Sequence, residues 1–361
     1  MIINYGRSGR RLLAATIAGI LIFTFQVAGA SENDTTVSHQ ESEFDPGTMI
    51  IEHITDAHEW HILTLGETHV SIPLPVILYS NGKLDVFLSS KFHHGHDAYK
   101  GYRLEAEGEN KGKIINEETG ELPLDLSITK NIASMLISMV LIIVIFISIG
   151  KSYVRRKGLP PKGLQSLLEP LILFIRDDVA KTSIGEKKYE KFLPYLLTIF
   201  FFIFFNNLLG LVPFFPGGVN LTGNIGVTMV MALFTFIITS FSANKNYWVH
   251  IVNTPGVPWW LKIPVPLMPV VELMGVFTKP FVLMVRLFAN ITAGHIIVLG
   301  FMSLIFIFGN MNPAIGYGVS VVSVAFAVFM GLLEILVAFI QAYVFTLLSA
   351  LYFGMAMEEH H

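Results

Sequence analysis

The chain has 361 residues, of which 53% are hydrophobic and only 14% are charged, and its formal net charge is −3. This composition, with a mean hydropathy of +0.60, is typical of proteins embedded in a membrane. The absence of cysteine excludes a disulfide framework and thiolate chemistry.

Residues 1–30 are predicted to be a secretory signal peptide. Arginines at positions 7, 10 and 11 form a basic start, an apolar core follows, and Ala28-Gly29-Ala30 is an A-x-A cleavage site. The alternative is a first transmembrane anchor that is not removed. Both interpretations place residue 31 outside the cytoplasm.

Residues 31–125 are predicted to form a small β-rich extracytoplasmic domain. Alternating residues flank Asn81-Gly82, which is a strong signal for a type I′ hairpin turn, and HILTLG and YRLEAE are further strand candidates. The region is acidic, since residues 31–130 carry 18 acidic and 7 basic side chains.

Eight histidines lie in the same region, and none has the spacing of the HExxH zinc motif. We expect most of them to be solvated surface residues, with structural or adventitious metal binding as the alternative. They include His53, His58, His61, His93, His94 and His96.

The stretch from Asn131 to Gly150 has no charge and is long enough to cross about 30 Å of hydrocarbon. Residues 151–191, which follow it, carry 10 basic and 5 acidic side chains, so this side is expected to face the cytoplasm. Within them, leucine and isoleucine recur at helical spacing from Leu164 to Ile175. This pattern predicts an amphipathic helix on the membrane surface or against a partner.

Two further spans are expected from Phe192 to Phe215 and from Ile225 to Ser242. Asn206 and Asn207 lie in the outer half of the first, and Asn224 is placed to cap the second, together with Thr222. The asparagines either cap helices and bond between them or line a water path. A loop rich in Pro, Trp and Lys is expected at residues 243–263, with Trp248, Trp259 and Trp260 suited to the membrane interface.

The last two apolar segments, Pro264–Phe308 and Pro313–Met357, are about twice too long for an upright span. Neither has a polar turn in its middle, although Pro269 and Pro280 permit kinks in the first. We therefore expect two long, steeply tilted helices. The predicted fold class is an all-α membrane protein of about five transmembrane helices with the β-rich outer domain, and its C-terminus lies in the cytoplasm.

Five charged or imidazole side chains interrupt these two segments: Glu272, Lys279, Arg286, His295 and Glu334. An arginine at a helix centre in a bilayer costs roughly 2.5–3.5 kcal/mol, so each charge implies a function or a partner. At 100° per residue, the first three share one helix face, and His295 points to the opposite side. Glu334 could pair with Arg286 or approach His295, and in the second case Arg286 needs a carboxylate from another polypeptide.

The run KPFVLMVRLFANITAGH, residues 279–295, resembles the signature of the a subunit of F-type ATP synthases. The matching positions are Lys279, Pro280, the Arg286-Leu287-Phe288-Ala289-Asn290 core, Ala293-Gly294 and the ionisable His295. Glu334 followed by Gln341, NNLLGLVP in the second span and TGN before the third also match. The resemblance covers about residues 126–361, which are predicted to form the membrane domain.

The sequence departs from the family pattern in two places. Many bacterial relatives carry Glu at the position of His295 and His at that of Glu334, whereas this chain has the two exchanged, as in the mitochondrial arrangement. Some relatives have an acidic residue where this chain has Gly210. A carboxylate and an imidazole are retained, so the exchange leaves the relay chemistry possible.

The resemblance implies a proton-channel stator of the membrane sector, not catalytic alone, in the bacterial inner membrane. Its partners would be the c-ring, the b subunit of the peripheral stalk and lipid, with no nucleic acid, cofactor or metal. Arg286 would face the ring carboxylate between two offset half-channels, and Glu272 would line the inner one, with Thr278 beside it. The outer half-channel would be lined by His295, Glu334, Gln341, Asn290 and Asn206.

Two alternatives belong to other classes. A secondary transporter that binds an anion at Arg286 would predict inverted repeats, which the sequence lacks. A purely structural membrane anchor for the outer domain would not require a charge such as Arg286 within an apolar segment.

Overall fold

The computed structural model describes residues 46–65, 68–95, 97–105, 110–212, 215–252 and 267–358. The predicted signal peptide, the first residues of the outer domain, His96, Pro213, Trp259 and Trp260 lie outside the described residues.

Five helices among the described residues are long and apolar enough to cross a membrane, as predicted. The second span ends at Gly210, five residues earlier than predicted, and the first ends at Arg155, five residues later than predicted, whereas the other three agree closely with their predicted ranges. They are α3 (Lys130–Arg155), α6 (Tyr189–Gly210), α7 (Ile225–Ser242), α9 (Leu267–Met311) and α10 (Pro313–Met357).

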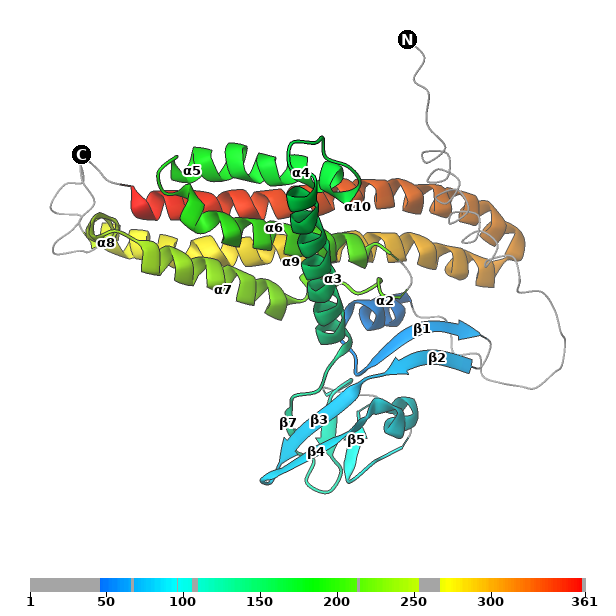
Figure 1. The fold of residues 1–361 in the computed structure, drawn as a ribbon. Helices are drawn as coiled ribbons and strands as arrows, with labels where there is room; N and C mark the ends of the chain where they lie inside the picture. Colours follow the sequence, from blue (N-terminus) through cyan, green and yellow to red (C-terminus); the bar gives the residue numbers. More distant parts are fainter. Residues whose placement is uncertain are drawn as a thin grey trace, which may run out of the picture. The chain divides into compact units, whose positions relative to one another are not determined.

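The two long helices, α9 and α10, are each 45 residues long, or about 68 Å at the α-helical rise. They lie side by side as a hairpin (Figure 1) and meet at Asn312, whose Oδ1 accepts a hydrogen bond from the Ala314 amide at 2.9 Å. Helix α9 continues through Pro280, so the proline does not divide the segment. The expectation of two long helices is therefore confirmed.

Helix α6 provides the aromatic core of the membrane domain. Its Phe192 stacks on Phe353 of α10 with ring centroids 4.9 Å apart, and Phe201 meets Phe146 of α3 at 4.8 Å. Phe200, fully buried, packs edge-on against Phe339 of α10 at 6.0 Å. These contacts fix α6 against α3 on one side and α10 on the other.

The predicted amphipathic helix is present as α4 (Leu164–Phe174), which continues into a π-helical segment, Ile175–Lys181, and α5 (Thr182–Ile184). In the π-helical segment, Asp177 accepts hydrogen bonds from Arg176 and Lys181. These bonds hold the pKa of the Asp177 carboxyl well below its usual range.

The predicted loop at residues 243–263 is partly helical, since α8 spans Lys245–Val252. Pro, Trp and Lys suggested an irregular interface segment, but the prolines lie beyond Val252 and leave these eight residues free to form helix.

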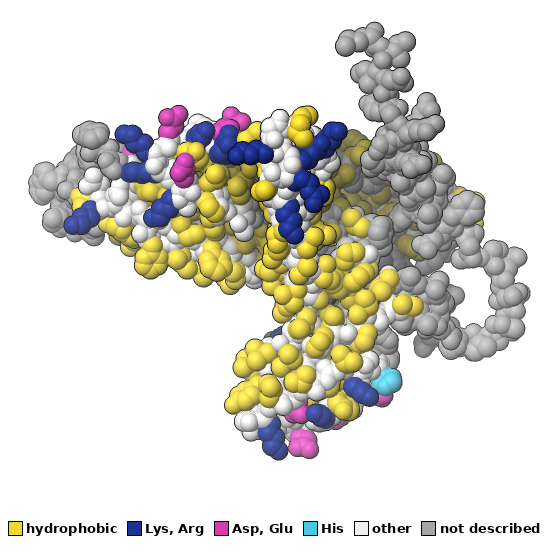
Figure 2. All heavy atoms as spheres, in the orientation of Figure 1, with side chains coloured by type: hydrophobic (Ala, Val, Ile, Leu, Met, Phe, Trp, Pro, Cys, Tyr) yellow, Lys and Arg dark blue, Asp and Glu magenta, His cyan; other side chains and the backbone are white. Residues whose placement is uncertain are grey.

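The surface of the membrane domain has an apolar part and a basic part (Figure 2). Hydrophobic side chains cover α3, α6 and α7, and lysine and arginine side chains gather along α4, α5 and the C-terminal end of α3. On α3 the exposed residues include Val140, Ile143 and Val144. An apolar band bordered by a basic edge is what a membrane-embedded bundle requires.

The outer domain is built from short antiparallel strands, as predicted, and from a helix, α2 (Pro46–Ile54), that was not predicted. Asn81 and Gly82 both have positive φ, at 50° and 79°, and close the predicted hairpin. The pairs β1–β2 and β5–β6 are separate from the sheet of order β4-β3-β7. The strands are β1 (Glu59–Leu65), β2 (Thr68–Pro73), β3 (Pro75–Ser80), β4 (Lys83–Leu88), β5 (Tyr102–Leu104), β6 (Ile114–Asn116) and β7 (Leu124–Asp125).

The core of this domain is small. It contains Val76, Leu78, Phe92, Tyr102 and Ile114, all of them buried. Phe92 comes from the 3₁₀ segment Ser89–Gly95, which also carries His93 and His94. Among the described residues, no three His, Asp or Glu side chains are grouped so that they could hold a metal ion.

Gly354 of α10 is predicted to be essential for the packing of α5. A Cβ at this position would collide with the carbonyl oxygen of Ser183. We expect Gly354→Ala to destabilise the protein by roughly 1–3 kcal/mol of overpacking, which exceeds the roughly 1 kcal/mol gained in helix propensity. Thermal unfolding of the detergent-solubilised protein should show a lower midpoint. Gly318→Ala, where nothing lies within 4 Å, is the control, and equal midpoints for both variants would contradict the prediction.

Candidate functional site

Arg286 lies on the exposed face of α9. Leu283 and Leu287, its neighbours in sequence, are 1% exposed and face the helical core, whereas Arg286 and Asn290 point away from it. Within the described parts of the chain, Arg286 makes no ion pair, so Glu334 is not its partner. Its environment on this face is apolar and exposed, and Val282, one turn before it, is 37% exposed.

Glu334 of α10 lies against Gly294 of α9. A Cβ at Gly294 would come within 2.5 Å of Glu334 Oε1, so only glycine leaves room for the carboxylate in this position. That oxygen is buried and has no hydrogen-bond partner in the described part of the protein. An ionisable group in such a position is typical of functional sites in membranes.

His295, the next residue, faces the end of α6. Its Nε2 lies 3.6 Å from where a Cβ of Gly210 would be. A Cβ at this position would make an ordinary van der Waals contact with the ring, so the imidazole packs directly against the backbone of Gly210. The structure therefore brings His295 and Glu334 into one region, on a different side of α9 from Arg286. Helical spacing predicted the placement of His295, whereas the position of Glu334 was left open between His295 and Arg286.

Asparagines of α6 border the same region. Asn207 donates to the carbonyl of Ala338 on α10 at 3.3 Å and accepts from Thr222 at 2.5 Å, so it bonds between helices. Asn206 donates only to its own helix, at Phe202, and its buried Oδ1 has no partner among the described residues. Of the two readings, interhelix bonding fits Asn207, whereas Asn206 retains an acceptor that water could satisfy.

The remaining outer candidates are placed differently. Gln341 is 8% exposed and lies two turns along α10 from Glu334. Asn290 is exposed beside Arg286, whereas Glu334 is half-buried. Asn224 caps α7 by accepting from the Gly226 amide at 2.9 Å, which confirms the predicted cap, whereas Thr222 bonds to α6 instead.

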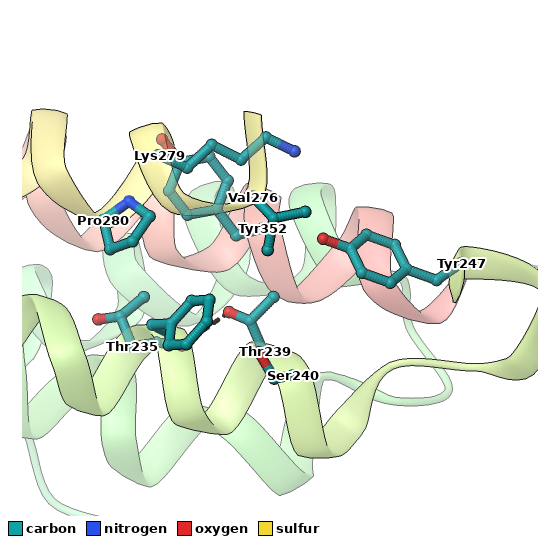
Figure 3. A pocket seen from close by; sticks show the side chains of 9 residues that line it. Thr235, Thr239, Ser240, Tyr247, Val276, Lys279, Pro280 and Tyr352 are labelled. Atoms are coloured by element: carbon teal, nitrogen blue, oxygen red, sulfur yellow. Dashed lines mark hydrogen bonds between the residues drawn. The ribbon is translucent and has the colours of Figure 1, made fainter. Parts of the chain in front are cut away.

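A second polar group lies between α7, α8, α9 and α10, around a cavity of about 20 Å³ that is large enough for one water molecule (Figure 3). Lys279 contributes to it with its Nζ 5.6 Å from the ring of Tyr352. The hydroxyl groups of Tyr247 and of the α7 threonines provide the other polar groups of the lining. The lining includes Thr235, Thr239, Ser240, Tyr247, Val276, Lys279, Pro280 and Tyr352.

Sequence reasoning identified Lys279 but missed the hydroxyl groups around it. Thr235 and Thr239 are four residues apart on α7, and Tyr195 bonds to Thr235 at 2.7 Å. The four-residue spacing places the two threonines on one face of α7 and could have indicated a polar site. Threonines in helices more often bond to their own backbone, however, as Thr239 does here. Glu272 is half-buried near the start of α9, and Thr278 bonds to its own helix at Met274.

Comparisons with known proteins agree with this architecture. A family model described as ATP synthase A chain matches residues 132–354. A second model, described as a domain of unknown function (DUF8433), matches residues 49–132 and thus the outer domain.

Relatives were found over the membrane domain. ATP synthase subunit a of Chloroherpeton thalassium is 46% identical over 245 residues, which cover 65% of this chain and 69% of the relative. ATP synthase subunit a 2 of Chlorobaculum tepidum is 48% identical over 64% of both chains. ATP synthase subunit a of Chlorobium phaeobacteroides is 43% identical over 69% of this chain and 71% of its own. Since the ATP synthase A chain model spans more than half of the sequence, the chain belongs to the F-type ATP synthase subunit a family.

Proposed function

We propose that this protein is the proton-translocating a subunit of an F-type ATP synthase, and that it couples proton flow to rotation of a c-ring. The observation that carries the proposal is Arg286, a permanent cation on an exposed apolar face with no acidic partner among the described residues. A membrane carboxylate on a neighbouring polypeptide is the group that such a site requires. Family membership supports the same partner.

The polar groups divide into two regions that fit two offset half-channels. His295, Glu334 and Asn206, with Gln341 beside them, are the outer candidates, and Asn290 would connect them to the face that carries Arg286. Glu272, Thr278 and the cavity around Lys279 and Tyr352 are the inner candidates. The separation of the two groups along α9 leaves Arg286 between them.

Arg286 would prevent a direct proton leak. A positive charge a few Å from a ring carboxylate favours its ionised form, so a site that faces Arg286 releases its proton before passing. Arginine suits this task because it stays protonated, whereas a desolvated lysine can lose its charge. Each proton that crosses 100 mV contributes about 2.3 kcal/mol to rotation.

We base the proposed orientation of the protein in the membrane on its basic edge, and the proposed tilt of α9 and α10 on their length. The basic edge along α4 and α5 is proposed to face the cytoplasm, the outer domain to face the opposite side, and the C-terminus to be cytoplasmic. Helices of about 68 Å fit a hydrocarbon layer of about 30 Å only when they tilt steeply. A steep tilt would let α9 present a long face to a cylindrical ring. The b subunit and lipid are the other partners we propose.

Replacement of Arg286 by alanine is expected to abolish ATP synthesis driven by a proton gradient, because ring carboxylates would no longer be forced to ionise at the interface. Arg286→Lys should retain at most a small part of the activity, since a lysine can deprotonate when desolvated. Inverted membrane vesicles that contain the whole complex provide the assay. Coupled synthesis by Arg286→Ala at the parental rate would refute the proposal.

His295→Ala and Glu334→Ala are expected to slow passive proton flux through the membrane sector, because each removes an ionisable side chain of the kind that forms proton relays in membranes. The measurement is pH-dye quenching in vesicles stripped of the catalytic sector, with quantities of assembled complex matched. Lys188→Ala, at the cytoplasmic start of α6, is the control. Parental flux in both variants would remove these residues from the proton path.

Gly294→Ala is expected to reduce proton flux while the complex still assembles. The new methyl group would displace the flexible Glu334 carboxylate rather than backbone, so the fold should tolerate it. Gly300→Ala on the same helix is the matched control, because nothing lies within 4 Å of that position. Equal flux in the two variants would show that the position of the carboxylate is unimportant.

A further inference from the structure

We propose that the outer domain forms the entrance to the outer half-channel, and that His58, held by Asp125, exchanges protons between bulk water and that entrance. The inference rests on the proposed function. It assigns a role to a region that lies outside the ATP synthase A chain match, which begins at residue 132.

The entrance is a cavity of about 370 Å³, large enough for several water molecules. One wall comes from the outer domain and carries Asp56, His58 and Asp125. The other comes from the membrane domain, at the start of α3 and of α7. The lining residues on that side are Thr129, Asn131, Ile132, Met135, Leu221, Asn224, Gly226 and Val227.

His58 is built into this wall rather than attached to its surface. Its side chain is 9% exposed, and its Nε2 lies 2.8 Å from Asp125 Oδ2. Its Nδ1 is buried and, within the described residues, has no hydrogen-bond partner. Thr129 Oγ1, in the same lining, is also buried without a partner among those residues. Buried polar atoms of this kind are normally satisfied by water.

The carboxylate orients the ring. Burial raises the pKa of the Asp125 carboxyl, but hydrogen bonds from His58 and Ser127 outweigh this effect and keep the pKa below its ordinary value. Ionised Asp125 accepts a hydrogen bond from the Nε2–H group, which leaves Nδ1 as the nitrogen that exchanges protons. A hydronium ion in the cavity gives its proton to Nδ1, and the imidazolium returns that proton to another water, so the ring is unchanged after each transfer.

The other charged groups near the pair are Asp56 and Lys130. Asp56 Oδ1 accepts from the amides of Ala57 and Asn131, both at 3.0 Å. Lys130 Nζ donates to the carbonyl of Thr55 at 3.0 Å. Both groups are thus fixed at the junction between the domains, where Asp56 adds negative charge to the cavity and favours cations within it.

A polar connection leads from this cavity to the membrane site. Leu221 and Asn224 line the cavity. Leu221 begins the 3₁₀ turn Leu221–Gly223, whose other two residues form hydrogen bonds with membrane helices. Thr222 donates to Asn207, and Gly223 accepts from Thr292 of α9 at 3.4 Å. Asn207 and Thr292 border the region that holds His295 and Glu334. The entrance and the proposed relay are therefore adjacent to the same short segment.

The first test replaces His58 with glutamine, which keeps a donor toward Asp125 but cannot titrate. Proton flux from the outside is measured in right-side-out vesicles that contain the whole complex. We expect a loss relative to the parent that grows as the outer pH is raised from about 7 to about 8.5, where free protons become scarce. Added imidazole should restore the flux, because it is small enough to enter the cavity and carry protons in place of His58.

His93→Gln is the matched control, since His93 belongs to the same domain but its side chain is 70% exposed. Unchanged flux in His58→Gln at every pH would overturn the proposal. A loss that is equal at all pH values and insensitive to imidazole would also overturn it, because it would indicate a structural role only. Arg286→Ala in the same vesicles distinguishes a failure of the proposed entrance from a failure of the proposed function, since it tests the function without changing the outer domain.

The second test uses the natural absence of cysteine. Met135 of α3 lines the cavity, and Met139, one turn further, is 40% exposed but does not line it. A cationic, membrane-impermeant thiol reagent added outside should label Met135→Cys and block proton flux, whereas Met139→Cys should stay unlabelled. Complete labelling of Met135→Cys with parental flux would overturn the entrance, as would failure of the reagent to reach it.

Discussion

The structure depends on the cost of placing charge inside hydrocarbon. An arginine at the centre of a membrane helix costs roughly 2.5–3.5 kcal/mol, so Arg286 is stable there only if a partner or water offsets that cost. Within the described residues the chain provides no carboxylate for it. Glu334 is instead kept on another side of α9, beside Gly294. Arg286 and Glu334 are thus kept apart within the long hairpin, so neither neutralises the other.

This separation requires close helix packing, and glycine makes it possible. Gly294 leaves room for the Glu334 carboxylate, and the His295 ring packs against the backbone of Gly210. Near the turn of the hairpin, a Cβ at Gly316 would lie 2.6 Å from Gly309 Cα, so the two backbones are in direct contact. Small residues give membrane helices such close approach when no hydrophobic force drives their association.

The sequence predicted the long hairpin well because length and apolar continuity decide it. A 45-residue segment without a polar break has few alternatives to a single helix, and Pro280 did not divide it. The opposition of Arg286 and His295 followed from helical spacing alone. Helix ends were less predictable, since Gly210 ends α6 where the apolar pattern continues. The contacts of Tyr352, Tyr247 and Thr235 could not be foreseen, because they depend on how four helices approach one another and not on any single segment.

The outer domain is attached directly to the first membrane helix, α3. The DUF8433 match ends at residue 132, where the ATP synthase A chain match begins, so the two regions adjoin without a linker. Asp56 bonds to the Asn131 amide in the first turn of α3, and the Lys130 amide donates to the Ala57 carbonyl at 2.8 Å. A carboxylate at a helix N-terminus is stabilised by the helix dipole as well as by the hydrogen bond. These bonds fix the residues that immediately precede His58, so the His58–Asp125 pair is held at the start of α3. A domain on a flexible tether could not keep one imidazole at the opening of a water path.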